Sequence, residues 1–540
     1  MAMNSEDIVS QVIKLYEQSS GNRGTWESHW DEIARRMFPL ASEYFTSDST
    51  GLSKGNKRNH EIYDSTAMIA LSRFGAIMDS LLTPRNQVWH RLQSAIDELN
   101  EDRQVQLWFD EVNRTLFKHR YSTNANFASQ NQMNFKSLGA FGSASLYIDA
   151  SEKEPGLRYK NCHLGETYFV ENHQGMIDRV IRKFRMTARQ IRQKWPNAMP
   201  DNVRSALEQD QSREFVILHF VGPNVDINPG MADFQGMPYA SYYVCLEGRA
   251  LMEVGGYNTF PYTPSRYEQA PNEVYGRSPA MDVLPAIKSL NEQKKTMLKQ
   301  GHRAVDPVLL VHDDGILDTF SLKPGHANAG AVTKDGRPLV HTLPGGSIAA
   351  GQEMMDEERK LINDSFLITI FQILAETPTM TATEVLERTR EKGILLAPTL
   401  GRQQSERLGP QIERELDVLA QQNLLPEMPP VLEEAGANFK VEYDSPLSRA
   451  QRAEESAGLM RTLESVLNVV NVTGDPAPLD HFDWDVITPE ISDINAVPAK
   501  WRKGAKQIQA ERQARAEKQQ QEDMVNAAPA MAGLQKAQQK

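Results

Sequence analysis

A break between two long helical segments constrains this chain more than any other feature. The stretch FLITIFQILAETPTMTATEVLERTREKG, residues 366–393, begins with an apolar run that ends at Ala375, continues through a short polar segment with Pro378, and then resumes a charged helical pattern. Thr381 as N-cap and Glu384 as the third helical residue fit a capping box. Proline and cap therefore both predict a short polar loop held between two helices.

The segments around this break extend the pattern. Residues 275–303 carry an apolar stripe at helical spacing, and Pro279 suits the first turn of a helix. Residues 351–374 start with acidic turns, which favour a helix N-terminus, and continue as a nearly apolar stretch that we expect to be buried. Residues 304–350, rich in Gly, Pro, Asp and His, predict a small β module. Residues 383–425 predict a further helix, which its internal glycine and prolines should bend.

The rest of the chain divides into four parts by its local pattern. Residues 1–144 predict amphipathic helices. Residues 145–274 alternate β-branched or aromatic runs with turn signals, which predicts a mixed sheet packed on the preceding helices. Residues 426–500 predict helices between proline-rich loops, and residues 501–540 a basic helix that passes into a disordered tail. At 540 residues the chain is too long for one core, and the expected fold class is α+β, predominantly helical.

Composition argues against several classes of protein. The chain has no run of 18 apolar residues and its first residues show no signal-peptide pattern, so we expect no membrane span and a reducing, cytosol-like compartment. Two cysteines, Cys162 and Cys245, cannot form a disulfide framework or a zinc site by themselves. The net charge of −12 argues against a protein that coats nucleic acid through its overall field, although it is compatible with a local basic patch.

Sequence signatures of catalysis are absent. The chain contains no Walker P-loop, no glycine-rich dinucleotide motif, no HEXXH zinc motif and no GXSXG elbow. His312, Asp313 and Asp314 could suggest a metal cluster, but they precede a glycine in a pattern typical of a turn. Asp483 and Asp485 are better explained as exposed residues at a helix cap. We therefore expect no enzyme activity, no cofactor and no metal.

Two basic clusters remain. The lysines of the 275–303 helix are Lys288, Lys294, Lys295 and Lys299. On an isolated helix they would form a solvated face, whereas a ring of many copies would turn them into belts of positive charge that contact phosphates. Residues 501–518 carry six Lys or Arg against two acids, and a solvated helix is an equally good interpretation there.

The order of these elements resembles the portal proteins of tailed bacteriophages, in particular the head-to-tail connectors of short-tailed phages. The similar stretches are WHRLQ after a helix ending in LLTP, YGRSPAMDVLPAIKSLNEQKKTML, ETPTMTATEVLERTRE, YDSPLSRAQRAEE and FDWDVITPEISDINAVPAKW. Tyr275-Gly276-Arg277-Ser278 is their most characteristic part. Together they span almost the whole chain, whereas the prolines at 398 and 410 depart from the family pattern because they predict an interrupted helix.

The resemblance implies an elongated subunit with wing, stem, clip and crown that assembles into a ring, with twelve copies as the expected number. The implied parts are the wing (1–144, 145–274 and the bent helix 383–425), the stem (275–303 and 351–374), the clip (304–350), the tunnel loop (375–382) and the crown (426–500). The residues implied to narrow the channel are Glu376, Thr377, Pro378, Thr379, Met380 and Thr381. The stem lysines would interrupt an acidic channel lining. The clip residues implied to bind partners are His312, Asp313, Asp314, Lys323, Lys334 and Arg337.

The function implied is a DNA channel at one capsid vertex, in the virion and, during assembly, in the host cytoplasm. Double-stranded DNA would be packaged and ejected through it. Implied partners are the terminase large subunit, then a tail adaptor, together with scaffolding and major capsid proteins and no membrane. The alternatives are a metal-dependent nuclease or another phage assembly factor.

Overall fold

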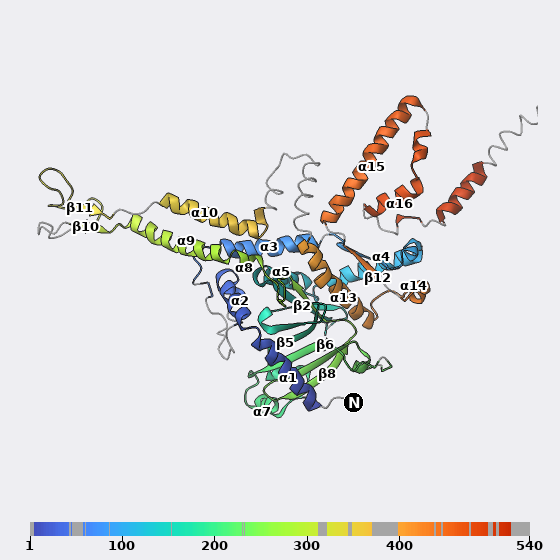
Figure 1. Ribbon diagram of the computed structural model, residues 1–540, viewed down its shortest axis with the longest axis horizontal. Helices are drawn as coiled ribbons and strands as arrows, with labels where there is room; N and C mark the ends of the chain where they lie inside the picture. The colour runs from blue at the N-terminus through green and yellow to red at the C-terminus, as the bar shows by residue number, and fades with distance from the viewer. Residues whose placement is uncertain are drawn as a thin grey trace, which may run out of the picture.

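A body of helices and two sheets carries two projections, an arm of two helices on one side and the C-terminal helices on the other (Figure 1). The computed structural model describes residues 5–42, 45, 58–59, 61–85, 87–152, 154–228, 230–231, 233–311, 321–343, 348–369, 398–436, 439–443, 446–474, 477–494, 501–503 and 507–519. Within these ranges helices outnumber strands, which confirms the expected α+β, predominantly helical class.

Five N-terminal helices follow the predicted amphipathic patterns. They are α1 (Ser5–Gly21), α2 (Gly24–Met37), α3 (Thr66–Leu82), α4 (Arg103–Arg120) and α5 (Phe127–Phe141). The apolar faces of α2, α3, α4 and α5 meet in one core, in which Trp30, Phe74 and Phe135 are fully buried. The buried residues of α1 belong to a separate cluster. Short turns of 3-10 helix lie at Pro39–Ala41, Asp97–Glu101, Leu164–Glu166, Phe234–Gly236 and Ala477–His481.

Two antiparallel sheets follow. The first has the order β3-β2-β9, with β2 (Ser143–Ala150), β3 (Leu157–Cys162) and β9 (Tyr262–Arg266). The second has the order β4-β5-β6-β7-β8, with β4 (Thr167–Glu171), β5 (Ile177–Thr187), β6 (Glu214–Pro223), β7 (Tyr239–Cys245) and β8 (Ala250–Tyr257). The predicted mixed sheet is therefore wrong, since every pair within these two sheets is antiparallel. Short turns join β2 to β3, β4 to β5 and β7 to β8, whereas longer connections join the other neighbouring strands.

Successive side chains of β6 point to opposite faces of the second sheet, and each face is covered by helices. Ile217 packs with Ile191 of α6 (Ala188–Lys194) and with α7 (Asp201–Gln209). The next residue, Leu218, points to the other face and packs with α1. This period of two buries the sheet between helices on both sides.

The arm begins with α8 (Pro279–Asp282) and consists mainly of α9 (Leu284–Val305) and α10 (Ile348–Ser365). A hairpin of β10 (Leu309–Val311) and β11 (Val340–Thr342) lies at its far end (Figure 1).

The predicted helix over 351–374 differs from the structure at both ends. It begins at Ile348 and ends at Ser365, and its last five predicted residues, 370–374, lie outside the described residues. Leu367 has a φ of 63°, a left-handed value that interrupts the helix. The neighbouring Phe366 is fully buried, so tertiary packing compensates for the strained backbone. No glycine or proline in the sequence indicates this break.

The second half of the body and the C-terminal projection complete the fold. Their elements are a π-helical turn (Gln404–Leu408), α13 (Gly409–Gln421), α14 (Pro430–Glu434), β12 (Phe439–Tyr443), α15 (Pro446–Thr473) and α16 (Trp484–Ile494). Residues 507–519 are also helical. Pro410 does not end the helix, because residues 398–421 are helical without a gap and the π-helical turn Gln404–Leu408 lies just before the proline. Pairing of β12 with β1 (His90–Ser94) joins distant parts of the chain.

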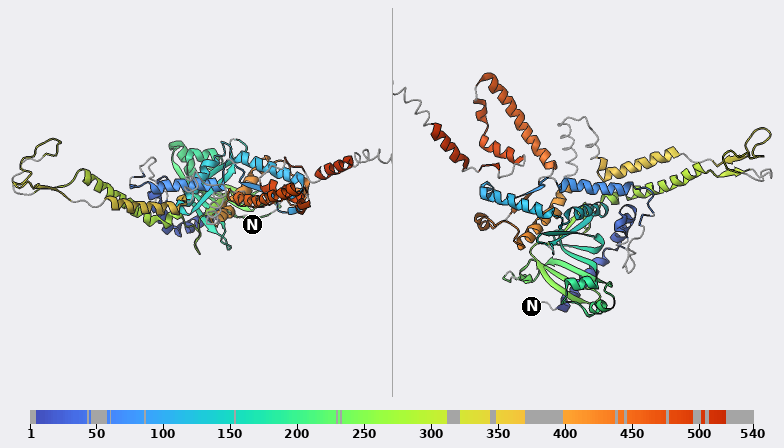
Figure 2. Two further views of the ribbon diagram at one scale, coloured as in Figure 1. Left: turned by 90° about the horizontal axis from the view of Figure 1, so that it is seen from above. Right: turned by 180° about the vertical axis from the view of Figure 1, so that it is seen from behind.

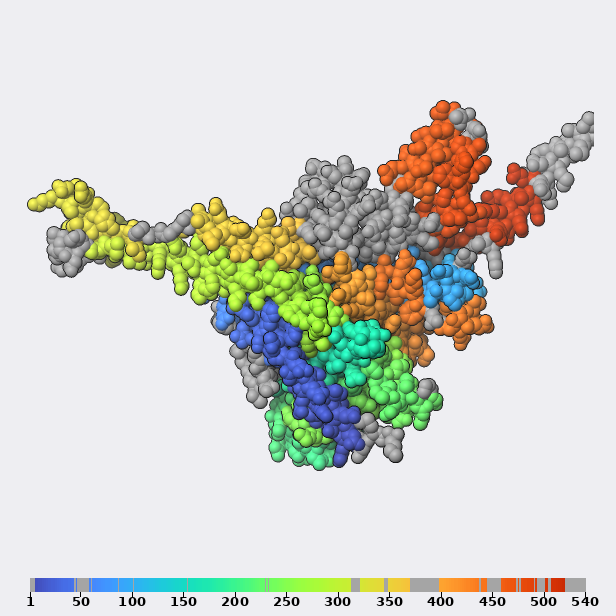
Figure 3. Space-filling model, viewed as in Figure 1, coloured from blue at the N-terminus to red at the C-terminus, as the bar shows by residue number. Residues whose placement is uncertain are grey.

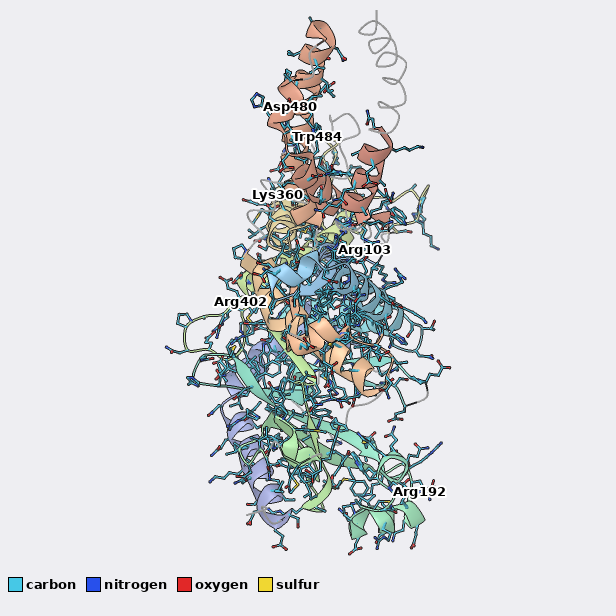
Figure 4. All side chains as sticks on the ribbon, turned by 90° about the vertical axis from the view of Figure 1, so that its right-hand side faces the viewer. Arg103, Arg192, Lys360, Arg402, Asp480 and Trp484 are labelled. Carbon is cyan, nitrogen blue, oxygen red and sulfur yellow. The ribbon has the colours of Figure 1, made fainter. Side chains whose placement is uncertain are left out.

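The body lies between two ends of different character. Figure 2 shows the arm and the C-terminal helices leaving the body on opposite sides. Figure 4 shows Asp480 and Trp484 of the C-terminal helices at one end of the molecule and Arg192 of α6 at the other. The arm projects from the body but stays joined to it through α2, α3 and the segment before α3.

Candidate functional site: the helical arm and its root

The arm reaches far beyond the body (Figures 1 and 3). Its helices run antiparallel, and a close seam joins them at Gly351 of α10. A Cβ added to Gly351 would lie 2.5 Å from Met297 Sδ of α9, so the two helices approach closely there. At the body end, the buried Phe366 packs edge-on against Phe74 of α3, with 5.8 Å between ring centroids.

The root of the arm is formed by Tyr275, Gly276, Arg277 and Ser278, the stretch that the sequence marked as most characteristic. The Tyr275 ring packs edge-on against the buried Trp30 of α2 at a centroid distance of 5.0 Å. Its hydroxyl accepts a hydrogen bond from the backbone N–H of Phe169 at 3.3 Å. This tyrosine therefore joins the entrance of the arm to α2 and to β4 of the second sheet.

Gly276 allows the root to touch the end of α5. A Cβ built on Gly276 would lie 2.3 Å from the carbonyl oxygen of Gly142, and one built on Gly142 would lie 2.2 Å from the carbonyl oxygen of Gly276. Gly142 also has a φ of 75°, which only glycine adopts readily. Backbone meets backbone here, so neither position has room for a side chain.

Ser278, two residues after Gly276, caps the first helix of the arm. Its Oγ accepts a hydrogen bond from the N–H of Met281 at 3.2 Å and donates one to the carbonyl oxygen of Ala140 at 2.9 Å. The same hydroxyl thus caps α8 and ties it to α5, which sets the direction in which the arm leaves the body.

A polar clamp fixes both arm helices to the segment before α3. Asn291 Oδ1 accepts a hydrogen bond from the Tyr63 N–H at 2.7 Å, and Asn291 Nδ2 donates to the Glu61 carbonyl oxygen at 2.9 Å. Arg359 of α10 donates to Asp64 Oδ2 at 2.7 Å. Burial opposes ionisation of Asp64, but hydrogen bonds from its own turn and from Arg359 outweigh it and hold the pKa of Asp64 below its ordinary value.

The four predicted stem lysines all lie on α9 but differ in their contacts. Lys288 is closest to the body and donates to Glu32 Oε1 of α2 at 2.7 Å, a hydrogen bond that lowers the pKa of Glu32. Lys295 lies 3.6 Å from Glu292, one turn earlier on the same helix. Lys294 is half-buried and Lys299 is exposed, and neither has an ion-pair partner in the described part of the chain.

The predicted clip residues that the structure describes are exposed and spread over the tip. Lys334 and Arg337 belong to one tight turn, in which the Thr333 N–H donates to the Arg337 carbonyl oxygen at 2.9 Å. Lys323 lies in a separate turn. The structure does not gather these three cations into one site. The other predicted site residues lie outside the described residues: His312, Asp313 and Asp314 of the clip, and Glu376, Thr377, Pro378, Thr379, Met380 and Thr381 of the tunnel loop.

The described residues offer no arrangement typical of a metal site or of a reactive thiol. No group of three or more His, Cys, Asp or Glu suited to a metal occurs in the described ranges. Burial raises the pKa of the thiols of Cys162 and Cys245, which keeps them protonated. Asp483 Oδ1 accepts from the Asp485 N–H at 2.9 Å, as expected of a residue at a helix start. None of the described helices combines the length and the apolar character that a membrane crossing requires.

Sequence reasoning missed a buried ionic network in the body. Arg120 of α4 and Glu415 of α13 are fully buried and form a bidentate ion pair. Glu415 also accepts from the Tyr159 hydroxyl at 2.7 Å. Burial and the charge of Arg120 lower the pKa of His90, which lies 2.8 Å from the guanidinium. A usable signal existed, because Glu415 occupies the stripe of α13 that also carries the buried Ile412.

Comparisons with known proteins agree with the sequence resemblance. A model of the family described as bacteriophage head to tail connecting protein matches residues 9–502. The probable portal protein of Bordetella phage BPP-1 is 28% identical over 519 residues, which cover 94% of this chain and 91% of that protein. The portal protein of Salmonella phage epsilon15 is 26% identical over the same coverage.

Solved structures give a weaker likeness. A chain of the virion of a native gene transfer agent particle matches 80% of this chain and 94% of its own length, with 12% identity and a TM-score of 0.37. A chain from the neck of an empty particle of that kind matches 76% and 91%, with 12% identity and a TM-score of 0.34.

Proposed function

The chain belongs to the bacteriophage head to tail connecting proteins, and from this premise we propose that copies of it form a ring around a DNA channel at one capsid vertex. Double-stranded DNA enters through this channel during packaging and leaves through it during ejection. The family match supports this role and gives no support to the alternative of a metal-dependent nuclease. The proposed role is structural and needs no catalytic residue.

One observation supports the proposed ring. The arm has exposed apolar side chains that the described part of its own subunit does not cover. They lie on both helices and on the tip, and are between 40% and 87% exposed: Leu298, Val305, Val308, Leu310, Val311, Leu322, Val332, Leu343, Ile348, Met354 and Leu361. Many exposed apolar side chains on one projecting element favour a contact with another chain. Identical arms standing side by side would cover these residues in every subunit at once.

The parts of the subunit then take the following proposed roles. The arm helices form the stem, and the tip with Lys323, Lys334 and Arg337 forms the clip, which docks the terminase large subunit and later the tail adaptor. Residues 375–382 form the tunnel loop that narrows the channel. The body forms the wing, where scaffolding and major capsid proteins bind, and the C-terminal helices form the crown. Assembly takes place in the host cytoplasm.

Substitution of exposed arm leucines tests the ring. L298E/L361E places two carboxylates on the surface that neighbouring arms would cover, and we expect mass photometry to show subunits in place of rings. Val225 is 86% exposed in the loop after β6, away from the arm, so V225E is the matched control and should assemble normally. Rings of unchanged yield in L298E/L361E would contradict the proposal.

Deletion of residues 377–381 tests the channel separately from assembly. We expect rings to form as in the wild type, because this loop is not needed for contacts between subunits. Phage particles that carry the deletion should package or retain less DNA, measured as DNA per particle. Normal DNA content in these particles would contradict the proposal that residues 375–382 narrow the channel.

A further inference from the structure

One face of α9 is basic, and it is the face turned away from α10. At about 100° per residue, Lys288, Lys295 and Lys299 lie within about 20° of a common line along the helix. Met297, which contacts Gly351 across the seam, lies about 180° from that line. Lys294 lies about 120° from it and so does not belong to this basic face.

One face of α10 is acidic, and it too is turned away from its partner helix. Glu353, Glu357 and Asp364 are exposed and lie within about 20° of a common line. The exposed Lys360 lies about 40° from that line, so the face is acidic mainly at its outer end, at Glu353 and Glu357. The buried residues Met355 and Ile362 lie on the opposite side of the helix. In cross-section, α9 and α10 therefore meet at an apolar seam. The basic face lies on the outer side of α9 and the acidic face on the outer side of α10.

Two of the three lysines on the basic face, Lys288 and Lys295, have ion-pair partners in their own subunit, and Lys295 also lies over the Tyr63 ring. Lys299, Glu353 and Glu357 form no ion pair with the described residues. Of the ion pairs in the described residues, those of the arm join α9 to α2 through Lys288, α9 to itself through Lys295, and α10 to Asp64 and to itself through Arg359. None of the described ion pairs joins α9 to α10. Glu353 and Lys299 accordingly keep their charges for a partner outside the subunit.

Two faces of opposite sign on opposite sides of one element suit a particular kind of assembly. A twofold contact would place a face against its own copy, basic on basic or acidic on acidic. A head-to-tail contact places one face against the other and closes into a ring when the rotation allows. Given the ring proposed above, on which this inference rests, we propose that the basic face of α9 in one subunit binds the acidic face of α10 in the next.

The levels of the charges along the arm fit this contact. Because α9 and α10 run antiparallel and Met297 lies opposite Gly351, Lys295 and Glu353 stand at nearly the same distance from the body. Rotation about a ring axis parallel to the arm keeps that distance, so Lys295 of one subunit meets Glu353 of its neighbour. Lys299 lies one turn further out, within reach of the same carboxylate. Lys294, which is off the basic face, is then the stem lysine left for the channel.

Charge reversal tests the contact in three steps. K295E/K299E makes α9 acidic, and E353K/E357K makes α10 basic, so each variant alone places like charges at every junction. We expect each to reduce the fraction of subunits in rings at low salt by at least about tenfold. The fourfold variant, which restores opposite signs with the faces exchanged, should return that fraction to within about twofold of the wild type.

Mixing the two double variants gives the sharpest readout. Alternation around the ring then places opposite charges at every junction, so two proteins that fail alone should form rings together. R189E/R192E, which reverses two exposed charges on α6, matches the change in net charge of K295E/K299E and should assemble normally. Circular dichroism shows whether each double variant keeps its helices.

The outcomes separate this inference from the proposed function. Wild-type rings with double variants that assemble equally well would overturn the charged contact and leave the ring standing. The contact is also refuted if folded double variants fail alone and neither mixing nor the fourfold variant restores rings. Absence of rings in the wild type would overturn the proposed function, and the contact with it.

Discussion

Gly276 gives the strongest prediction, because its neighbour is backbone that cannot move aside. In G276A the new Cβ would lie 2.3 Å from the Gly142 carbonyl oxygen and 3.0 Å from the Glu268 carbonyl oxygen. Carbon–oxygen contacts normally start at about 3.3 Å, so α5 and the root of the arm must separate by about 1 Å. The Arg277 N–H, which donates to Glu268 at 2.6 Å, would lose that geometry too.

Overpacking of this kind costs about 1–3 kcal/mol. Since Gly276 does not have a positive φ, alanine also restricts the unfolded chain and recovers about 0.4–1 kcal/mol. We expect a net loss of about 1–2 kcal/mol in the free energy of unfolding. Urea denaturation followed by tryptophan fluorescence measures it, since Trp26 and Trp30 lie against the Tyr275 ring.

Gly301 provides the matched control on the same arm. It lies inside α9, and a Cβ added there would have nothing within 4 Å, so G301A removes only the entropic cost of glycine in a helix. We expect G301A to be more stable than the wild type by up to about 1 kcal/mol. Opposite signs for the two glycine-to-alanine changes are the expected result. If G276A is as stable as the wild type, the backbone contact at the root of the arm is not what fixes it.

Two further predictions concern charges inside the subunit. E415Q leaves the Arg120 guanidinium buried without a counter-charge and should lower the free energy of unfolding by about 3–5 kcal/mol. The control E413Q changes an exposed residue on the same helix and should alter it by less than about 0.5 kcal/mol. Equal effects of the two substitutions in a thermal-shift assay would show that the buried network does not stabilise the body. The pKa of Asp64 is lower in the folded chain than in the unfolded chain, so its ionised form stabilises the clamp to Arg359 above about pH 4, and that contribution is lost as the pH falls through the folded pKa. The stability difference between the wild type and D64N should therefore shrink towards acid pH, and a difference that is constant from pH 6 to pH 3 would contradict this assignment.

Local pattern predicted the elements well, since each depends on residues close in sequence. The stripe with Ile287 and Leu290 indicated α9, and β-branched runs indicated the strands of both sheets. Long-range features gave no such signal. β1 pairs with β12 in the register His90 with Tyr443, and nothing in either segment specifies the other. The break at Leu367 was missed for the same reason, because buried Phe366 and not a turn residue compensates for it.

The candidate site was predicted only in part. The sequence identified the lysines of α9. That Lys288, Lys295 and Lys299 share one face and Lys294 does not can be interpreted only once the position of α10 is known. Asn291 was missed because an amide in an amphipathic helix does not reveal that backbone groups of Tyr63 and Glu61 will meet it. Gly276 stood inside a characteristic motif, yet its partner Gly142 is distant in sequence.

The central claim is that many copies of this chain stand side by side around a shared hole. Negative-stain electron microscopy of the purified full-length chain, viewed along the particle axis, tests it most directly. The account predicts closed rings of one cyclic symmetry with a central opening, and twelve subunits as the expected number. A protein that stays monomeric at high concentration in every salt tested would contradict it.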